Sequence, residues 1–293
     1  SKALLEKQMK IFKFKKKIKL LDEDKVEKYN LDNKKINLID IKFKRRKDKY
    51  LEQLSNSSNQ FIKSSLDIAF KILKRGKVYK FINGPISKKN FLNQKYLGMT
   101  EYISSHFSVK NSAMLIYNKE LAVCPLTTHL PLKLVTKNIN EKKIEKTVKL
   151  ISKFYEEKFL FKPKIAILGL NPHCETIEKF NEDEKIIRPL VQKLYKKKYK
   201  IYGPYSADTI FLKDNRKKYN VIIGMYHDQV LAPIKSLFEF DAINITIGLP
   251  FIRISPDHGP NVEMFGKNLS NPKSLMQAIK FLENKWILKQ KKV

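Results

Sequence analysis

From Val78 to its end, the chain alternates short apolar runs with longer stretches in which apolar residues recur every three or four positions. The short runs predict strands within 78–85, 112–118, 120–131, 164–173, 220–229 and 243–251. The periodic stretches predict helices at 139–159, 184–198 and 274–290. Continuous apolar strands that alternate with helices are typical of an α/β protein with a largely parallel or mixed sheet.

The residues before Val78 carry a weaker pattern. Lysine runs alternate with short apolar stretches, of which residues 36–41 (INLIDI) predict one strand. The Ser- and Asn-rich residues 53–60 predict a loop, because their side chains compete for backbone hydrogen bonds. Residues 61–76 then predict a helix that ends at Gly76, a residue suited to helix C-termini.

Composition places the chain among globular proteins. Its 293 residues are 42% hydrophobic, which is enough for a sizeable core. No apolar run approaches the roughly 20 residues of a membrane span, and the N-terminus lacks the apolar stretch of a signal peptide. Two cysteines, Cys124 and Cys174, cannot form a disulfide framework. We therefore expect a cytoplasmic protein that does not contact a membrane.

The net charge of +31 has two interpretations. Only six of the 60 basic residues are arginines, whereas proteins that read nucleic acids usually rely on Arg. The many lysines accompany abundant Asn and Ile, as an AT-rich coding sequence produces. We interpret the charge as a solvated lysine-rich surface and expect no specific nucleic-acid partner. A surface that binds polyanions is the alternative.

Three of the five histidines follow predicted apolar strands: His129, His173 and His227. Ligands bind open α/β sheets at the carboxyl ends of the strands. Three imidazoles that converge there would bind a divalent metal. Their spacings of 44 and 54 residues match no known ligand pattern, so hydrogen-bonded loop histidines are an equal alternative.

Other polar residues near these strands suit a small anion. Lys235 and Arg253 can bind a phosphate by charge-assisted hydrogen bonds, and Asn244 lies in the neighbouring segment DAINITIG. Lys235 could equally be one more surface lysine. Asp228 could orient His227 or act as a base, or it could cap a helix.

Residues 255–272 (SPDHGPNVEMFGKNLSNP) are rich in turn formers. They form either a plain surface loop or a loop that wraps a nucleotide. Neither GxGxxG nor GxxxxGK[ST] occurs, which argues against an ordinary Rossmann site or a P-loop.

Taken together, these segments resemble the 4-hydroxythreonine-4-phosphate dehydrogenase family of pyridoxal phosphate synthesis. The resemblance runs from Asn83 to the C-terminus and rests on NGPISK, GMTE, TTHLPL, GLNPH, YGPYSADT, MYHDQVLAPIK, NITIGLPFIR, SPDHG and GKNLSNP, in that order. It implies a two-domain fold similar to isocitrate and isopropylmalate dehydrogenases, a three-layer α/β/α arrangement with a mixed sheet. We expect residues 1–83 and 256–293 to form a first, discontinuous domain and residues 84–255 to form the second. The resemblance also implies a homodimer with the active site at the subunit interface.

The resemblance assigns roles to individual residues. It implies metal binding by His129, His173 and His227, and substrate binding by Thr100, Lys235, Asn244 and Arg253. By analogy with the wider fold family, NAD would contact His258, Gly259, Asn261 and Asn271. Asp228 and Lys88 are the candidates for the catalytic general base. Three imidazoles suit Zn²⁺ better than Mg²⁺, with Co²⁺ a further alternative.

The activity that the resemblance implies is NAD-dependent oxidation and decarboxylation of 4-phosphohydroxy-L-threonine to 3-amino-2-oxopropyl phosphate. The substrate is therefore expected to be a small phosphorylated hydroxy-amino acid. Two alternatives remain. One is a related dehydrogenase of threonate or erythronate 4-phosphate. The more distant one is a nucleic-acid-binding protein built on a decayed enzyme, against which the intact histidine set argues.

The sequence also departs from the family pattern. Met99 stands where the family motif GHTE has a substrate-contacting histidine, and a thioether cannot donate that hydrogen bond. Residues 174–185 (CETIEKFNEDEK) replace a glycine-rich loop of the AGEGG kind. The family's opening motif GDPAGIGPE is missing, and residues 1–60 show no clear match. We expect the first domain either to lack its N-terminal part or to have diverged there.

Overall fold

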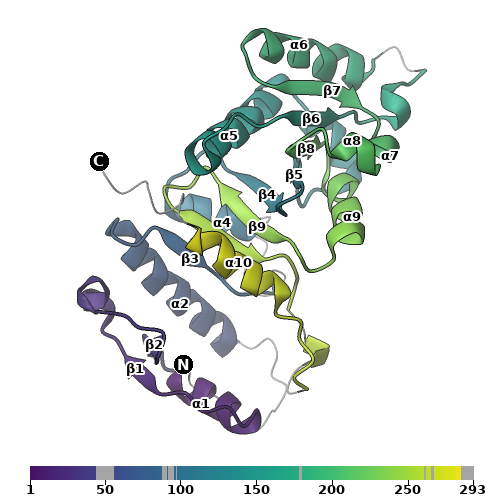
Figure 1. Ribbon diagram of the computed structural model, residues 1–293. Helices are drawn as coiled ribbons and strands as arrows, with labels where there is room; N and C mark the ends of the chain where they lie inside the picture. Colours follow the sequence, from purple (N-terminus) through teal and green to yellow (C-terminus); the bar gives the residue numbers. More distant parts are fainter. Residues whose placement is uncertain are drawn as a thin grey trace. The chain divides into compact units, whose positions relative to one another are not determined.

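The computed structural model describes residues 1–43, 56–87, 91, 96, 98–177, 180–260, 262–264 and 267–284. The chain divides into two compact units (Figure 1). The first unit contains residues 1–80, 86–94 and 259–270, and the second contains residues 81–85, 95–258 and 271–293. The expected domain boundaries near residues 83 and 256 stay a prediction.

In its first segment, the first unit contains two short parallel strands and three helices among the described residues. The strands are β1 (Ile18–Leu20) and β2 (Ile36–Leu38), and the helices are α1 (Lys2–Ile11), the 3-10 helix η1 (Glu23–Lys28) and α2 (Asn56–Lys74). A further 3-10 helix, η6 (Val262–Met264), lies in its third segment. The strand predicted within 36–41 is confirmed. The loop predicted at 53–60 is wrong for residues 56–60, which form the first turns of α2; Ser and Asn favour helix N-termini as well as loops.

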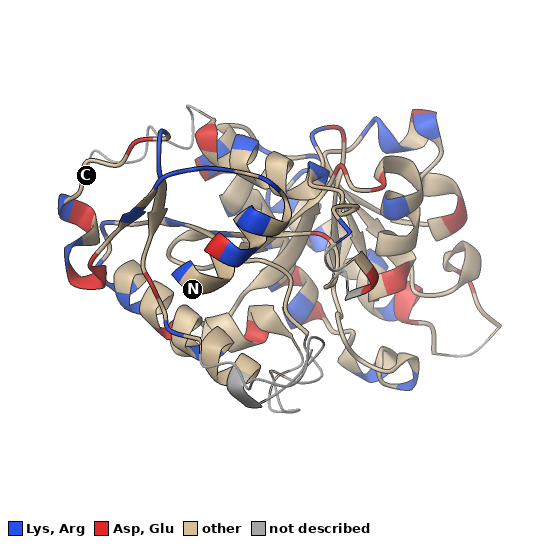
Figure 2. Cartoon of the chain, turned by 90° about the horizontal axis from the view of Figure 1, so that it is seen from below, with Lys and Arg blue, Asp and Glu red and all other residues tan. Residues whose placement is uncertain are grey.

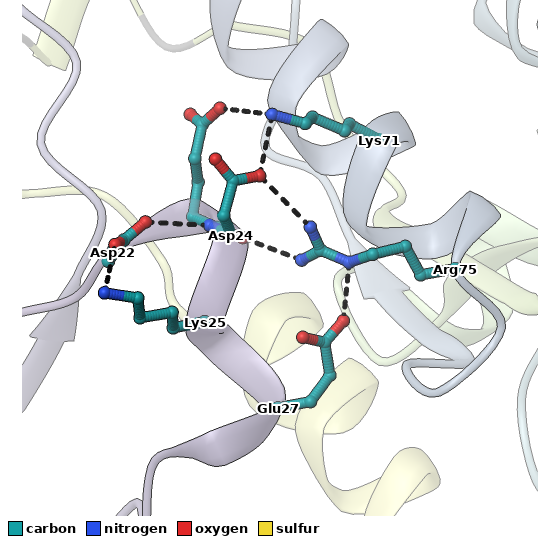
Figure 3. Close-up of polar contacts among 7 residues, drawn as sticks. Asp22, Asp24, Lys25, Glu27, Lys71 and Arg75 are labelled. Atoms are coloured by element: carbon teal, nitrogen blue, oxygen red, sulfur yellow. Dashed lines mark hydrogen bonds and ion pairs between the residues drawn. The ribbon is translucent and has the colours of Figure 1, made fainter.

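An ionic cluster joins η1 to the end of α2 (Figure 3). Lys71 contacts Glu23 and Asp24 at 2.9 and 2.8 Å, and Arg75 contacts Glu27 at 2.7 Å. Just beyond these residues, Gly76 adopts a φ of +75°, so the predicted end of this helix is confirmed.

The described strands of the large sheet follow the order β3-β10-β9-β4-β5-β8-β6-β7. They are β3 (Lys80–Ile82), β4 (Ala113–Tyr117), β5 (Ala122–Pro125), β6 (Ile165–Leu168), β7 (Ile201–Tyr205), β8 (Val221–Gly224), β9 (Ile243–Ile247) and β10 (Ile252–Pro256). Neighbours from β5 to β7 are parallel, and those from β10 to β5 are antiparallel. The prediction of a mixed sheet is confirmed.

The helices of the second unit are α4 (Met99–His106), α5 (Glu141–Phe159), α6 (Arg188–Lys196), α7 (Ala207–Ile210), α8 (Lys213–Arg216), α9 (His227–Phe238) and α10 (Lys273–Glu283). Short 3-10 helices, η2 (Leu132–Leu134), η3 (Thr136–Asn138) and η4 (Pro172–Cys174), follow strands β5 and β6, and a π-helical turn, η5 (Asp183–Ile187), precedes α6. The predicted helices at 139–159 and 184–198 are confirmed in α5 and in η5 with α6. That at 274–290 is confirmed as far as Glu283, and residues 285–290 lie outside the described residues.

Two hydrophobic cores lie on opposite faces of this sheet. One contains apolar side chains of α5, α6 and α10, and the other contains those of α7 and α9. Successive residues of the central strands alternate between them: Ile165 and Ile167 face the first core, and Ala166 and Leu168 face the second. The expected three-layer α/β/α architecture is therefore confirmed (Figure 1).

Lysine and arginine are spread over both units, with acidic residues among them (Figure 2). Among the described residues, no helix combines the length and apolar character that a membrane crossing needs.

Candidate functional site

The antiparallel strands β9 and β10 present a polar face. In their register Arg253 lies opposite Thr246, and Ser255 lies opposite Asn244, so these four side chains share one side of the sheet. The alternate residues Ile243, Ile245, Ile252 and Ile254 enter the core beneath α5 and α10. The strands therefore bury apolar residues on one side and carry hydrogen-bonding groups on the other.

Arg253 is the centre of this polar face. Its Nε donates to Asn83 Oδ1 at 2.7 Å, and its NH1 donates to Thr246 Oγ1 at 3.0 Å. The hydroxyl of Thr246 also lies 3.4 Å from that of Thr100, in the first turn of α4. Thr246 thus links Thr100 to Arg253, two of the residues expected to bind substrate.

The charge of Arg253 is deeply buried. The residue is only 2% exposed, and burial lowers the pKa of its guanidinium to about 10, an effect that the charge of Glu101 opposes. The group therefore stays charged at neutral pH. Its partners are neutral, and in the described part of the chain no carboxylate lies within ion-pair distance of it. A buried cation without a counter-charge is costly, so this geometry favours an anionic ligand.

Asn244 carries an unsatisfied acceptor on the same face. Its Oδ1 is buried and accepts no hydrogen bond. A buried acceptor without a donor costs about 1–3 kcal/mol. An N–H or O–H group of a ligand would satisfy it.

Lys235, in the last turn of α9, forms an ion pair with Asp257, which directly follows β10. The Lys235 Nζ lies 2.6 Å from Asp257 Oδ2 and also donates to the Asp257 carbonyl oxygen. Burial raises the pKa of Asp257, whereas the Lys235 ammonium opposes this shift. Asp257 and Thr246 are not among the residues predicted from the sequence, although Asp257 directly precedes His258 and Thr246 lies two residues after Asn244.

The three expected metal ligands follow three neighbouring parallel strands. His129 follows β5, His173 follows β6, and His227 follows β8, which lies between them in the sheet. The structure brings two of them together, since the ring centroids of His129 and His227 are 5.7 Å apart. Among the described residues, no group of three or more His, Cys, Asp or Glu side chains is placed to hold a metal.

A carboxylate forms a hydrogen bond with one of these imidazoles, and a second carboxylate lies near another. Nδ1 of His227 lies 2.6 Å from Asp228 Oδ1, and Nδ1 of His173 lies 4.0 Å from Asp208 Oδ2. The pKa of Asp208 is lowered, chiefly by a hydrogen bond from Ser206 and also by His173. A carboxylate at Nδ1 leaves Nε2 available as a metal donor, so this chemistry fits a divalent cation.

His129 lies against a glycine. A Cβ atom at Gly98 would come within 2.9 Å of both the His129 ring and the Glu101 carboxylate. Oε2 of Glu101 is itself buried without a hydrogen-bond partner. Gly98 thus leaves the space that these two side chains occupy at the start of α4.

A fully buried carboxylate fixes the turn that carries His173. Asp183 accepts hydrogen bonds from the backbone N–H groups of Leu170 and Asn171 at 2.6 and 3.1 Å, and from the Asn171 side chain at 2.9 Å. His173 and Cys174 have φ values of +55° and +63°, which are unfavourable for residues other than glycine. Apart from the acidic run around it, no local sequence pattern distinguishes Asp183.

The structure describes few contacts of the residues expected to bind NAD. Asn261, like the candidate base Lys88, lies outside the described residues. Asn271 Oδ1 accepts from the backbone N–H of Lys273, at the start of α10. The His258 ring lies 6.4 Å from that of Phe240, and a Cβ atom at Gly259 would meet no atom within 4 Å.

Comparison with known proteins identifies relatives of this chain. Residues 1–282 match the sequence model of the family described as pyridoxal phosphate biosynthetic protein PdxA. This match includes residues 1–60, so the expectation that these residues lack a family match is wrong.

Individual relatives agree with the family match. The chain is 41% identical over 234 residues to a 4-hydroxythreonine-4-phosphate dehydrogenase of Sulfurihydrogenibium sp., covering 78% of this chain and 72% of that protein. It is 30% identical to a D-threonate 4-phosphate dehydrogenase of Pectobacterium atrosepticum, covering 73% and 68%. The structure of a 4-hydroxythreonine-4-phosphate dehydrogenase from Klebsiella pneumoniae superimposes with a TM-score of 0.77 at 25% identity, covering 94% and 86%.

Proposed function

The chain belongs to the PdxA family of pyridoxal phosphate biosynthetic proteins, and we propose that it is an NAD- and metal-dependent 4-hydroxythreonine-4-phosphate dehydrogenase. In the proposed reaction, 4-phosphohydroxy-L-threonine loses a hydride from C3 and then carbon dioxide, which leaves 3-amino-2-oxopropyl phosphate.

The observation that carries this proposal is the buried charge of Arg253, whose direct hydrogen-bond partners are neutral. The substrate has a phosphate and a carboxylate, and either could supply the missing anion. Thr100 is connected to Arg253 through Thr246, and Asn244 offers a free acceptor on the same face. Together these groups would orient one end of the substrate by charge-assisted and neutral hydrogen bonds.

The proposed metal ligands are His129, His173 and His227. The hydrogen bond between Asp228 and Nδ1 of His227 supports this assignment, because it leaves Nε2 of that ring to face the cation. When bound, a divalent cation, with Zn²⁺ preferred over Co²⁺ and Mg²⁺, supplies Lewis acidity that lowers the pKa of the substrate hydroxyl and stabilises the charge formed by decarboxylation.

The proton of the C3 hydroxyl must pass to a base. Asp228 remains a candidate for that base, since it contacts His227 and its side chain is 82% exposed. The loop at 258–271 is proposed to bind NAD, the hydride acceptor, through His258, Gly259, Asn261 and Asn271. The homodimer with its active site at the subunit interface and the cytoplasmic location stay predictions.

A specific observation favours a second candidate function. Met99 is only 7% exposed and lies directly before Thr100 in α4, so an apolar side chain occupies the position of the family's histidine. A site changed in this way could prefer a hydroxy acid without the amino group, such as D-threonate or erythronate 4-phosphate. The similarity to the Pectobacterium protein is consistent with this alternative.

A substrate panel distinguishes the two functions. Initial rates of NAD reduction are measured with 4-phosphohydroxy-L-threonine, D-threonate 4-phosphate and erythronate 4-phosphate, for wild type and Met99→His. We expect the highest kcat/KM of the wild type with the amino acid substrate. A higher kcat/KM with either phosphorylated hydroxy acid would replace the first function by the second.

A further inference from the structure

We propose that Asp257 is a positioning residue that fixes the ammonium group of Lys235 for binding the substrate. This inference rests on the proposed function, in which Lys235 binds the phosphorylated substrate. Asp257 lies in the motif SPDHG, and the proposed function assigns it no role.

The carboxylate of the Lys235–Asp257 ion pair is more buried than that of any other ion pair in the described part of the chain. The Asp257 side chain is 10% exposed, which makes it the least exposed carboxylate among the described ion pairs. The Lys235 side chain is 37% exposed, whereas Oδ2 of Asp257 is buried. A surface ion pair contributes little, whereas a buried carboxylate strongly restrains the cation that it contacts.

Asp257 is itself held in place. Its backbone N–H donates to Ser274 Oγ at 2.9 Å, and that hydroxyl donates to the carbonyl oxygen of Ala242 at 2.6 Å. Ser274 is fully buried in α10, and Ala242 directly precedes β9. The backbone of Asp257 is therefore tied through Ser274 to α10 and to the residue that precedes β9.

The pair also continues the polar face of β9 and β10. Arg253 and Ser255 lie on that face, and Asp257 follows directly after Pro256, the last residue of β10. Lys235 comes from α9, which packs against the sheet on the side opposite the α5 and α10 core. Asp257 thus places the Lys235 ammonium at the end of the row that contains Arg253.

The hydrogen bonds of Lys235 support a fixed orientation. An ammonium has three N–H donors. The Asp257 carbonyl accepts one of them, and the carboxylate attracts the ammonium at 2.6 Å. Asp257 Oδ2 is buried and accepts no well-directed hydrogen bond, so its contact with the Lys235 ammonium is an ion pair. At least one N–H remains for a substrate oxygen.

A double-mutant cycle tests this inference. We measure kcat and KM for wild type, Asp257→Asn, Lys235→Met and the double variant, with Glu145→Gln as a matched control. Glu145, in α5, pairs with Lys149 at 2.8 Å and with Lys197 at 3.7 Å, and no role in binding or catalysis is proposed for it. Thermal unfolding is measured for all five proteins, so that loss of fold is recognised.

If Asp257 acts through Lys235, the two substitutions are not additive. We expect Asp257→Asn to lower kcat/KM about tenfold in wild type, mainly through KM, but less than twofold in the Lys235→Met background. Glu145→Gln should leave kcat/KM within twofold of wild type. The same factor in both backgrounds, or no effect in wild type, would overturn the proposal.

A second readout does not depend on turnover. Acylation of Lys235 by an amine-reactive reagent is followed by peptide mass spectrometry in wild type and Asp257→Asn. We expect the variant to react at least threefold faster at Lys235 and equally fast at the exposed Lys213. An unchanged rate at Lys235 overturns the proposal. If wild type turns over no phosphorylated substrate, the proposed function fails, and the acylation rates still decide the role of Asp257.

Discussion

The carboxylate of Asp183 accepts two hydrogen bonds from Asn171, one from its backbone N–H at 3.1 Å and one from its side-chain amide at 2.9 Å. Asn171 lies two residues before His173, so its contact with the fully buried Asp183 fixes the turn that presents the imidazole. Asp183 lies in a run of acidic residues of the kind expected at a surface, yet it holds the turn that carries the proposed metal ligand His173.

Asp183→Asn should destabilise the protein by about 2–3 kcal/mol, because an amide cannot accept from every donor that surrounds the carboxylate. Urea unfolding measures this loss. The matched control is Asp214→Asn in the exposed helix α8, which should change the free energy of unfolding by less than about 0.5 kcal/mol. Equal stabilities of the two variants would contradict the role of Asp183.

Gly98→Ala should weaken metal binding. The backbone of Gly98 is extended, with a φ of −164°, so alanine fits the backbone itself. Its Cβ atom would however lie 2.9 Å from the His129 ring and must displace it or Glu101. We expect at least a tenfold weaker Zn²⁺ affinity in a calorimetric titration. Gly84→Ala is the control, since a Cβ atom there meets nothing within 4 Å, and it should bind Zn²⁺ as wild type does.

Arg253→Lys should lower kcat/KM roughly a hundredfold, although it keeps the charge, because one ammonium cannot replace a fixed guanidinium fork at a buried anion site. The loss should appear mainly in KM for the phosphorylated substrate. Arg216→Lys serves as the control, since Arg216 donates to the carbonyl oxygen of Phe211, away from the proposed substrate residues. Similar kinetics of Arg253→Lys and wild type would show that the guanidinium does not bind the substrate.

The ionic cluster of the first unit should make stability depend on acid and salt (Figure 3). A hydrogen bond from Lys71 lowers the pKa of Asp24, and a backbone hydrogen bond, followed by Arg75, lowers that of Glu27. A carboxylate whose pKa is lower in the folded than in the unfolded state stabilises the fold at pH values above its unfolded-state pKa. This contribution is lost as the pH falls through its folded-state pKa.

We therefore expect the unfolding temperature to fall as pH drops below about 4, and the fall to be smaller in Arg75→Met, which removes one cation of the cluster. The cluster is exposed, so 1 M NaCl should reduce the difference between the two proteins at neutral pH. Parallel acid profiles of wild type and Arg75→Met would show that the cluster does not contribute to stability.

Much of the fold could be predicted from the sequence because local patterns determine it. The α5 helix shows this: its apolar residues recur with helical periodicity, and Asn140 caps it by accepting from the N–H of Lys143. The strands β6 and β8 are continuous apolar runs, as expected for strands buried on both faces. The sequence pattern does not locate the start of α2, because Ser and Asn are common in both loops and helix ends.

The candidate site was predictable only in part. Arg253 and Thr100 could be named as substrate ligands from their motifs, but the groups that connect them could not. Thr246 lies 146 residues from Thr100, and Asn83 lies 170 residues from Arg253. Only the register of β9 and β10 and the position of α4 bring these side chains together. Hydrogen bonds between residues so far apart in the sequence depend on tertiary packing, which a local sequence pattern does not describe.

The most direct test of the proposed function is NADH formation with 4-phosphohydroxy-L-threonine and NAD, followed by absorbance. The assay is run on the protein as purified, after chelation, and after Zn²⁺, Co²⁺ or Mg²⁺ is added back. We expect turnover that chelation abolishes and that Zn²⁺ or Co²⁺ restores better than Mg²⁺. No NADH formation by folded, metal-loaded protein would contradict the assignment of this chain as a 4-hydroxythreonine-4-phosphate dehydrogenase.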